Sequence, residues 1–316
     1  MQATVLGATG GIGNAVMHAF LNRGHRVVAL ARRPEAIAPQ PGLTIVAGDV
    51  LDEKALNRAC DGSDVVFHGI NLPYPEWDPG MLDITSRILA VTQQKGQPLL
   101  FPGNLYGLGP DYSEPLTEQS RHEPSARKGH LRNRLEGMLQ DASARGARTI
   151  ILRMGDFFGG GGESTWMHHL TAKAATGGAL QYPSAMDIPH AWAYLPDAAD
   201  TLVLLAERRA ELEAFAVFHF EGHILTGTQW ADAVRAALGA ADRPVRRMPW
   251  WLMSPLRLFN PMIRELWEMR YLWDQPVRMD GSKLRDTLGP VPHTPLEQAM
   301  HTTLNRSPEG TITQAS

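Results

Sequence analysis

A short basic run, RKGHLRNRLE at residues 127–136, holds side chains that could exchange protons or bind anions. Lys128 and Arg132 are four residues apart, so on a helix they share one face, which is otherwise lined by leucines. An amine beside a guanidinium can act as a general acid or base when burial and the neighbouring charge lower its pKa towards neutrality. Arg132 itself can only orient or stabilise negative charge. A basic helix face without a chemical role is the alternative for this pair, and we expect Arg127 and Arg134 to face solvent.

A second candidate is the glycine-rich stretch VLGATGGIGNAV at residues 5–16, which lies between an apolar run and a helical pattern. Gly7 permits a tight turn, Gly10 lets the backbone approach a pyrophosphate, and Gly13 lets a helix and a strand pack closely. The first amides of the following helix then face the phosphates. The stretch therefore predicts a dinucleotide-binding loop. Its predicted cofactor-binding residues are Gly7, Thr9, Gly10, Gly11, Ile12 and Gly13.

The end of the next apolar run, ALARRP, carries Arg32 and Arg33 and no carboxylate. Dinucleotide folds that select NAD usually place an acid about 20 residues after the glycine loop, where it binds the ribose 2′-hydroxyl. Guanidinium groups instead suit a 2′-phosphate. We therefore predict that NADP(H) is preferred and that NAD(H) is possible, the alternative being a solvated arginine pair.

The elements that must position these residues alternate between short apolar runs and helical segments, which is typical of a parallel sheet covered by helices. The apolar runs are rich in Val, Ile and Leu, as in strands buried on both faces. We expect strands at residues 3–7, 26–30, 43–48, 64–69, 98–103, 148–153 and 216–222, and helices at roughly 11–23, 53–60, 79–95, 127–145, 165–176 and 228–239. The predicted fold class is α/β: a Rossmann-type doubly wound parallel sheet with a smaller, mainly helical C-terminal substrate region.

The alternation of apolar runs and helical segments changes after residue 155, and this change predicts the domain organisation. We expect a dinucleotide-binding core over 1–155, a substrate-binding or cap region over 156–305 that is interleaved with the last strands of the core, and a flexible tail over 306–316. The segment 248–273 is dense in Trp and Met. Its expected role is a helical cap on the main domain, with a lid over an apolar substrate or a membrane-surface helix as alternatives.

Composition excludes several classes of protein. The 316 residues are 43% hydrophobic and 20% charged, with a net charge of -3, so nothing favours nucleic acid or a membrane as a partner. Cys60 is the single cysteine, which excludes an intrachain disulfide and thiolate metal sites, and no metal is expected. The glycine loop begins too early to leave room for a signal peptide, and no long uncharged apolar window suggests a transmembrane helix. We expect a cytoplasmic protein.

The spacing G-x-x-G-x-x-G, present as GATGGIG, resembles the short-chain dehydrogenase/reductase superfamily, and further motifs resemble its extended branch of NAD-dependent epimerases and dehydratases. GDV at 48–50 resembles the family's adenine contact. HGIN at 68–71 occupies the place of its small-residue loop beside the ribose, although His68 and Asn71 depart from that composition. The further cofactor contacts implied by the resemblance are Asp49, Val50, Gly69, Asn71 and Lys128.

The resemblance also implies where catalysis takes place. The extended branch ends its fifth strand in a pattern like S-S-x-x-V-Y-G, and FPGNLYG matches the end of that pattern with Tyr106 and Gly107. It places its catalytic pair in Y-G-x-S-K-x-x-x-E, and KGHLRNRLE fits that frame with Lys128 at the tyrosine position and Arg132 at the lysine position. The resemblance thus implies a catalytic helix with substituted chemistry. Lys128 would transfer the proton beside Arg132, and Asn104 or Tyr106 would contact a carbonyl.

Later segments also resemble the extended branch. ILRMGDFFGGGG at 151–162 matches its R-P-x-x-V-Y-G-P segment at Arg153. IPHAWAYLPDAADTLVLLAE at 188–207 resembles its segment around a histidine or valine and an aspartate ahead of a helix, which Asp197 is expected to cap. His190 could face the substrate pocket or be a buried, hydrogen-bonded histidine. The sequence alone does not decide between these two roles of His190.

The resulting hypothesis is an NADP(H)-dependent oxidoreductase, or an epimerase that uses transient oxidation, acting on a small apolar or aromatic carbonyl or hydroxyl substrate. The alternative is a non-catalytic NADP(H)-binding regulator that senses the redox state, because the family's tyrosine–lysine pair is replaced. A homodimer is possible by analogy with the superfamily.

Overall fold

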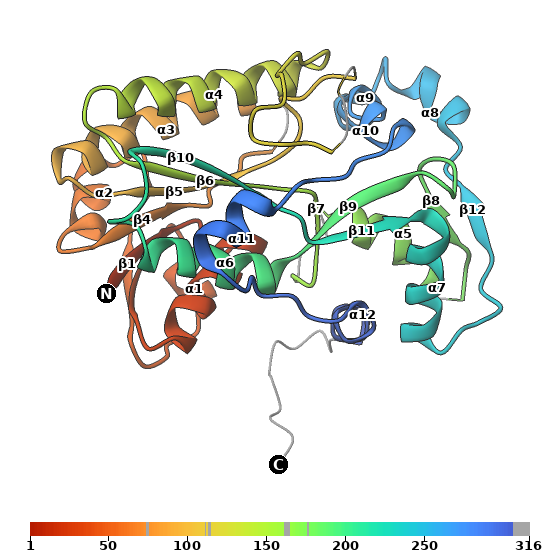
Figure 1. The fold of residues 1–316 in the computed structure, drawn as a ribbon, viewed down its shortest axis with the longest axis horizontal. Helices are drawn as coiled ribbons and strands as arrows, with labels where there is room; N and C mark the ends of the chain where they lie inside the picture. Colours follow the sequence, from red (N-terminus) through yellow and green to blue (C-terminus); the bar gives the residue numbers. More distant parts are fainter. Residues whose placement is uncertain (74–75, 111, 113–114, 161–164, 176, 306–316) are drawn as a thin grey trace.

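The computed structural model describes residues 1–73, 76–110, 112, 115–160, 165–175 and 177–305. Its centre is a seven-stranded parallel sheet with the strand order β10-β6-β5-β4-β1-β2-β3 (Figure 1). The strands are β1 (Gln2–Leu6), β2 (Arg26–Ala31), β3 (Leu43–Ala47), β4 (Val65–His68), β5 (Leu99–Gly103), β6 (Thr149–Met154) and β10 (Phe215–Phe220). The predicted fold class and the seven predicted strands are confirmed. The chain order reverses between β1 and β4, which is where such sheets bind ligands.

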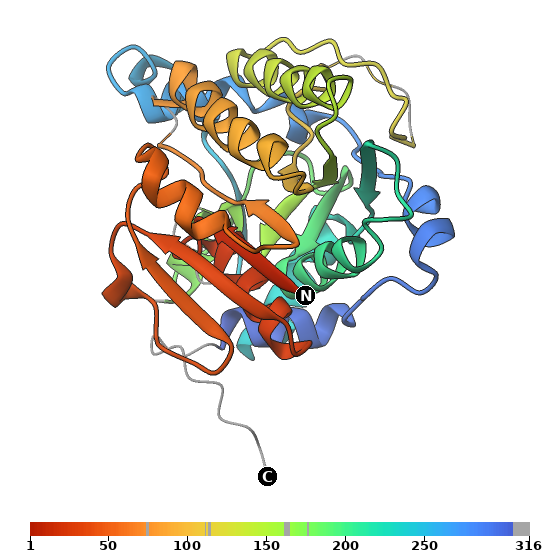
Figure 2. The same ribbon diagram turned by 90° about the vertical axis from the view of Figure 1, so that its left-hand side faces the viewer.

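Helices cover both faces of this sheet, as Figures 1 and 2 show from two directions. One face carries α2 (Glu53–Cys60), α3 (Trp77–Gln94) and α4 (Arg127–Ser143), and the other carries α1 (Gly11–Asn22), α6 (Leu195–Glu207) and α11 (Ser282–Leu288). Every residue of β6 is buried, so its continuous apolar run reflects a strand covered on both sides. A short 3-10 helix, Pro34–Ala36, follows β2.

The second half of the chain adds two small sheets that the sequence did not predict. One has the order β11-β9-β7, from β7 (Asp156–Phe158), β9 (Pro189–Tyr194) and β11 (His223–Thr226), and the other pairs β8 (Leu180–Tyr182) with β12 (Val245–Arg247). Helices α5 (Trp166–Ala175), α7 (Gly227–Leu238) and α12 (Leu296–Leu304) accompany them (Figure 1). Three of these strands have only three residues, and β11 has four, which is too short for an alternating pattern to be recognised in the sequence. Strand β9 is buried throughout and therefore shows no alternation.

Asp197 does not cap α6, and that prediction is wrong. The residue at the N-cap of α6 is Tyr194, and Asp197 lies inside the first turn, where it is buried. Its carboxylate accepts hydrogen bonds from the amide of Thr294, at 2.6 Å, and from the Thr294 hydroxyl, at 2.7 Å. Asp197 therefore ties α6 to the segment that leads into α12.

The Trp- and Met-rich segment forms three short helices, α8 (Trp250–Leu256), α9 (Pro261–Glu268) and α10 (Tyr271–Asp274). Trp250 and Trp273 are buried, as expected for a helical cap, whereas Trp251 and Phe259 are 77% and 85% exposed. The segment therefore packs on the molecule through part of its apolar surface. No helix among the described residues has the length and apolar character needed to cross a membrane.

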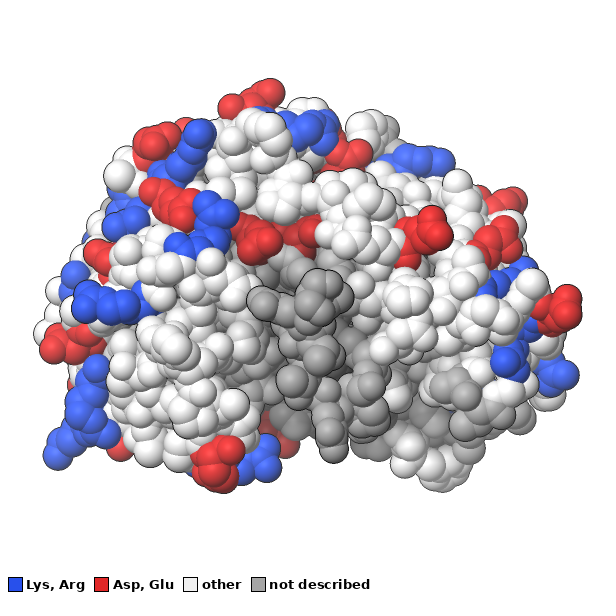
Figure 3. All heavy atoms as spheres, turned by 90° about the horizontal axis from the view of Figure 1, so that it is seen from below, with Lys and Arg blue, Asp and Glu red and all other residues white. Residues whose placement is uncertain are grey.

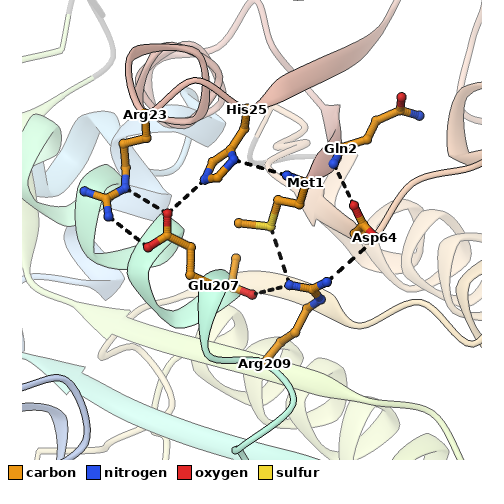
Figure 4. A network of polar contacts seen from close by, with 8 residues as sticks. Met1, Gln2, Arg23, His25, Asp64, Glu207 and Arg209 are labelled. Atoms are coloured by element: carbon orange, nitrogen blue, oxygen red, sulfur yellow. Dashed lines mark hydrogen bonds and ion pairs between the residues drawn. The ribbon is translucent and has the colours of Figure 1, made fainter.

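A polar network joins the amino ends of the central strands (Figure 4). The Glu207 carboxylate, at the end of α6, accepts hydrogen bonds from Arg23 and pairs with His25 at 2.8 Å, and the Met1 amino group lies 3.3 Å from His25. These contacts hold α1 and α6 together at the amino ends of the strands, opposite their carboxyl ends. On the face shown in Figure 3, acidic and basic side chains are interspersed over the described surface.

Candidate functional site

A cavity of about 740 Å³ lies at the carboxyl ends of the central strands. Its wall begins at the glycine loop after β1, passes the ends of β2, β4, β5 and β6, and reaches β9 and α10. A single hollow therefore joins the predicted cofactor loop to the second half of the chain. Its volume lies within the range of ordinary ligand sites.

Two glycines of the loop are required by the fold itself. Gly7 has a φ of +86°, and a side chain there would also press on the backbone of Gly69, at 2.8 Å. A side chain at Gly13 would collide with the carbonyl of Gly7. These are the tight turn and the close helix–strand packing that the sequence predicted.

Gly10 and Gly11 are different, because no contact with the described residues requires them to be glycine. Both are exposed and line the cavity. A Cβ atom at Gly10 would come no closer to a described atom than 3.4 Å, from the Gly7 carbonyl oxygen, and one at Gly11 no closer than 3.8 Å, from Leu195. Helix α1 begins here without a side-chain cap and without an acidic residue in its first turn. This open cradle at a helix N-terminus fits a pyrophosphate group.

At the far end of the cofactor half, Arg32 lines the cavity and Arg33 does not. The Arg32 side chain is 79% exposed, and its guanidinium lies 3.9 Å from the Asp49 carboxylate. Asp49 also accepts a hydrogen bond from the Leu51 amide, and both Asp49 and Val50 line the cavity. The structure thus places one of the two predicted arginines at the mouth of the cavity.

The end of β4 contributes Gly69 and Asn71, which line the cavity as predicted, and also His68. The His68 ring is fully buried, with Nε2 3.1 Å from the Thr85 hydroxyl, and its Nδ1 has no hydrogen-bond partner among the described residues. Burial, and then the charge of Arg132, lower the pKa of His68 to about 3. His68 is therefore a neutral imidazole at physiological pH.

Helix α4 turns Lys128 and Arg132 inward, but only Arg132 reaches the cavity. Lys128 is 3% exposed and is absent from the described lining. The Arg132 guanidinium lies 4.9 Å from the centre of the Trp77 ring and 5.6 Å from that of Phe101, and its Nη1 donates to the Pro102 carbonyl at 3.4 Å. Arg132 thus places a fixed positive charge against the aromatic wall.

The two predicted carbonyl contacts, Asn104 and Tyr106, both line the cavity just beyond β5. The Asn104 side-chain oxygen accepts a hydrogen bond from the Tyr106 amide at 3.1 Å, which leaves the amide NH₂ as the group that can donate to a ligand. The Tyr106 ring stacks on Trp77, and its carbonyl accepts a hydrogen bond from the Tyr271 hydroxyl. Arg127 and Arg134 lie on the exposed side of α4, as predicted.

Glu136 and Arg153 form a buried ion pair behind this wall. The Arg153 Nη2 atom donates to Glu136 Oε2 at 2.5 Å, and both side chains are almost fully buried. Because Glu136 belongs to α4 and Arg153 to β6, the pair fixes the helix on the sheet. It therefore positions Arg132 without itself lining the cavity.

The sequence missed one polar pair in the substrate half. Asp156 begins β7, His190 lies on β9, and the two are joined by a contact of 2.7 Å between His190 Nε2 and Asp156 Oδ2. The His190 ring stacks on Trp273, with centroids 3.7 Å apart, and both members of the pair line the cavity. Both readings of His190 are therefore confirmed, since it is buried, hydrogen-bonded and part of the pocket wall. Asp156 could have been found from its place two residues beyond the carboxyl end of β6.

The rest of the substrate half is largely apolar. Trp77 and Met81 of α3, Trp166 of α5, Leu272 of α10 and Val277 line it. Glu76 and Thr165 also line the cavity, so single polar groups stand among larger apolar side chains, which is the usual composition of a small-molecule site.

The first part of the chain is similar to known proteins. Residues 7–128 match a protein-family model described as NAD(P)H-binding. A segment of 72 residues is 39% identical to the uncharacterized protein YLL056C of Saccharomyces cerevisiae and covers 22% of this chain and 24% of that protein. A segment of 67 residues is 34% identical to 3 beta-hydroxysteroid dehydrogenase/Delta 5-->4-isomerase of Mycobacterium tuberculosis and covers 21% of this chain and 18% of that protein. The similarity to these curated relatives thus spans a quarter of their length or less.

Solved structures resemble almost the whole chain. UDP-glucose 4-epimerase from Bifidobacterium longum, in complex with NAD+ and UDP, has a TM-score of 0.77 at 19% identity over 96% of this chain and 97% of that one. dTDP-glucose 4,6-dehydratase from Bacillus anthracis, in complex with NAD, has a TM-score of 0.77 at 13% identity over 96% and 95% of the two chains. At these identities the likeness shows that the chain shares the fold of these two structures.

Proposed function

We propose that the chain is an NADP(H)-dependent oxidoreductase, or an epimerase that works by transient oxidation, acting on a small apolar or aromatic substrate with a carbonyl or hydroxyl group. The observation that carries the proposal is the continuity of the cavity. An open glycine cradle at one end and a mainly apolar wall with a few polar groups at the other share one hollow. A nicotinamide cofactor bound there supplies hydride transfer.

The preference for the phosphorylated cofactor rests on Arg32. Its exposed guanidinium lines the cavity just beyond β2, where dinucleotide-binding folds that select NAD usually carry an acidic residue. Asp49, 3.9 Å away, would partly offset that charge. Arg33 lies outside the lining, so we assign the larger part of any 2′-phosphate recognition to Arg32.

The substrate class rests on the wall opposite the cofactor loop. The structural neighbours named above are a UDP-glucose epimerase and a dTDP-glucose dehydratase. In this chain the corresponding half carries Trp77, Trp166, Leu272 and Val277. Such a wall favours an apolar or aromatic molecule over a charged sugar nucleotide, because phosphates buried against these apolar side chains would find few hydrogen-bond partners.

Arg132 and Asn104 are the proposed contacts for the substrate oxygen, because both line the cavity and both can donate hydrogen bonds. Tyr106 lies beside them. The proposal that Lys128 transfers the proton stays a prediction, and Lys128→Met tests it, since loss of the amine should abolish turnover if Lys128 is the proton donor. Unchanged turnover would assign the proton to another residue.

A second candidate, a non-catalytic sensor of the NADP(H) pool, is favoured by the burial of Lys128 outside the cavity lining. A sensor must bind the oxidised and reduced cofactors unequally, because only differential affinity can shift a conformational equilibrium. Unequal affinity for NADPH and NADP+ without turnover of any substrate would support this candidate.

The first experiment is a fluorescence titration with NADPH and NADH, read through energy transfer from the eight tryptophans. We expect tighter binding of NADPH. In Arg32→Ala, NADPH affinity should fall about 10-fold or more while NADH affinity stays the same, as for the loss of a charge-assisted hydrogen bond. Arg33→Ala is the matched control, with a smaller effect. Equal affinity for the two cofactors in the unmodified protein would overturn the NADP(H) assignment.

A further inference from the structure

We propose that Asp156 is a catalytic residue of the substrate half, held in position by His190, and that it binds and deprotonates a hydroxyl group of an otherwise apolar substrate. This inference rests on the proposed function, because it assigns the proton transfer that accompanies hydride transfer. It differs from the hypothesis that Lys128 of α4 transfers the proton, because it assigns this role to Asp156 of β7.

The first support is the geometry of the pair. His190 Nε2 lies 2.7 Å from Asp156 Oδ2, so with an ionised carboxylate Nε2 carries the proton and donates it. The Asp156 Oδ1 atom receives no hydrogen bond from any described residue, and Asp156 lines the cavity. One carboxylate oxygen is therefore held, and the other is left to accept a bond from a ligand.

The second support is the way in which the structure fixes His190. The ring is 4% exposed and lies parallel to the Trp273 ring, at 3.7 Å and an interplanar angle of 9°. Trp192 packs against it edge-on at 5.5 Å. A ring held in this way can give the carboxylate only one orientation, which is what a positioning residue must do.

The third support is the setting of the pair. Asp156 follows β6 by two residues, so it lies at the strand ends where ligands bind in such sheets, near Gly155 and Met154 of the same wall. A carboxylate among apolar side chains is costly unless it makes specific hydrogen bonds. One of these comes from His190, and a substrate hydroxyl would supply another.

The chemical step balances with the proposed reaction. When the alcohol is oxidised, its carbon loses a hydride to the oxidised nicotinamide and its oxygen loses the proton to Asp156 Oδ1, giving the carbonyl compound, the reduced cofactor and one proton held by Asp156. The proton then leaves to solvent. In reduction the same carboxyl returns the proton to the oxygen as the carbon accepts the hydride.

The test uses indanol and indane, which differ only in the hydroxyl group, with binding measured by ligand-observed NMR in the absence and presence of NADP+. The unmodified protein should prefer indanol by about 10-fold or more, as expected for a hydrogen bond to a charged group. Asp156→Ala should lose this preference while it keeps its affinity for indane and for NADPH. Asp187→Ala, at an exposed carboxylate just before β9, is the matched control and should keep the preference.

Two variants separate positioning from packing. His190→Gln keeps a donor for Asp156 and should retain most of the preference, whereas His190→Phe keeps a ring that can stack on Trp273 and should lose it. The reverse order, or a preference that survives in Asp156→Ala, overturns the proposal, as does equal binding of indanol and indane by the unmodified protein. A preference that depends on Asp156 in a protein that neither binds NADPH nor reduces indanone would support the hydroxyl site and refute the proposed function.

Discussion

Replacing Gly10 by alanine should weaken cofactor binding without weakening the fold. Gly10 has φ -85° and ψ 161°, an extended conformation that alanine adopts without strain. The added Cβ would lie 3.4 Å from the Gly7 carbonyl oxygen, an ordinary contact, and would project from an exposed position that lines the cavity. Since it meets no described residue more closely, it should obstruct a ligand that approaches the backbone at this point.

The size of the effect follows from what the methyl group displaces. A backbone hydrogen bond to a charged phosphate contributes about 1.5–3 kcal/mol, so its loss should raise the Kd for NADPH by roughly 10- to 100-fold. The free energy of unfolding should stay the same or rise by about 0.4–1 kcal/mol, because alanine restricts the unfolded chain. In this one variant the affinity for NADPH should therefore fall while the stability of the fold does not.

Two further glycines provide the controls. Gly13→Ala would force a methyl group against the Gly7 carbonyl, so its unfolding free energy should fall by about 1–3 kcal/mol. Gly137→Ala on α4 meets nothing within 4 Å and should stabilise the helix by about 0.5–1 kcal/mol without changing NADPH binding. Urea unfolding and fluorescence titration measure the two quantities. An unchanged Kd in Gly10→Ala would show that the cofactor does not lie against this loop.

Two predictions concern buried charge. Because burial lowers the folded pKa of His68 to about 3, from an ordinary value of 6.5, the unfolded chain takes up the proton first as the pH falls below 6.5. This group alone should therefore lower the unfolding free energy by about 2 kcal/mol between pH 7.5 and pH 5. Urea unfolding at the two pH values measures this loss. The loss should be smaller in His68→Asn and should remain in Thr85→Val. Glu136→Gln should cost about 3–5 kcal/mol, because it leaves Arg153 buried without its counter-charge. Asp83→Asn breaks an exposed pair with Arg87 and should cost less than about 1 kcal/mol, and comparable losses in the two variants would contradict the assigned role of burial.

The sequence predicted the central sheet because its strands are continuous apolar runs, and this signal comes directly from burial on both faces. The glycine loop was equally readable, since Gly7 and Gly13 are fixed by a positive φ and by close packing. The short strands around the substrate half carry no such signal. Strand β9, PHAWAY, is buried along its whole length yet contains proline, histidine and alanine, so neither alternation nor a continuous aliphatic run marks it.

Side-chain periodicity also has a limit at α4. The spacing of Lys128, Arg132 and the leucines correctly predicted which face of the helix is turned inward. It could not predict which part of that face meets a cavity, because this depends on neighbouring segments packed over the helix start. Arg132 reaches the cavity and Lys128 does not. The pairing of Asp156 with His190, 34 residues apart, likewise depends on how β7 and β9 pair.

Two positions of the motif on α4, Gly129 and Glu136, are explained by packing. A side chain at Gly129 would collide with the Tyr106 carbonyl, and Glu136 holds Arg153 in a buried ion pair, so the fold itself requires both. The match to the family's frame on these two positions therefore does not imply that proton transfer takes place at Lys128. Among the polar groups that line the cavity, Arg132 cannot exchange a proton, whereas the Asp156–His190 pair can. In the proposed reaction, Arg132 of α4 would therefore supply the positive charge, and Asp156 of β7 would be the base.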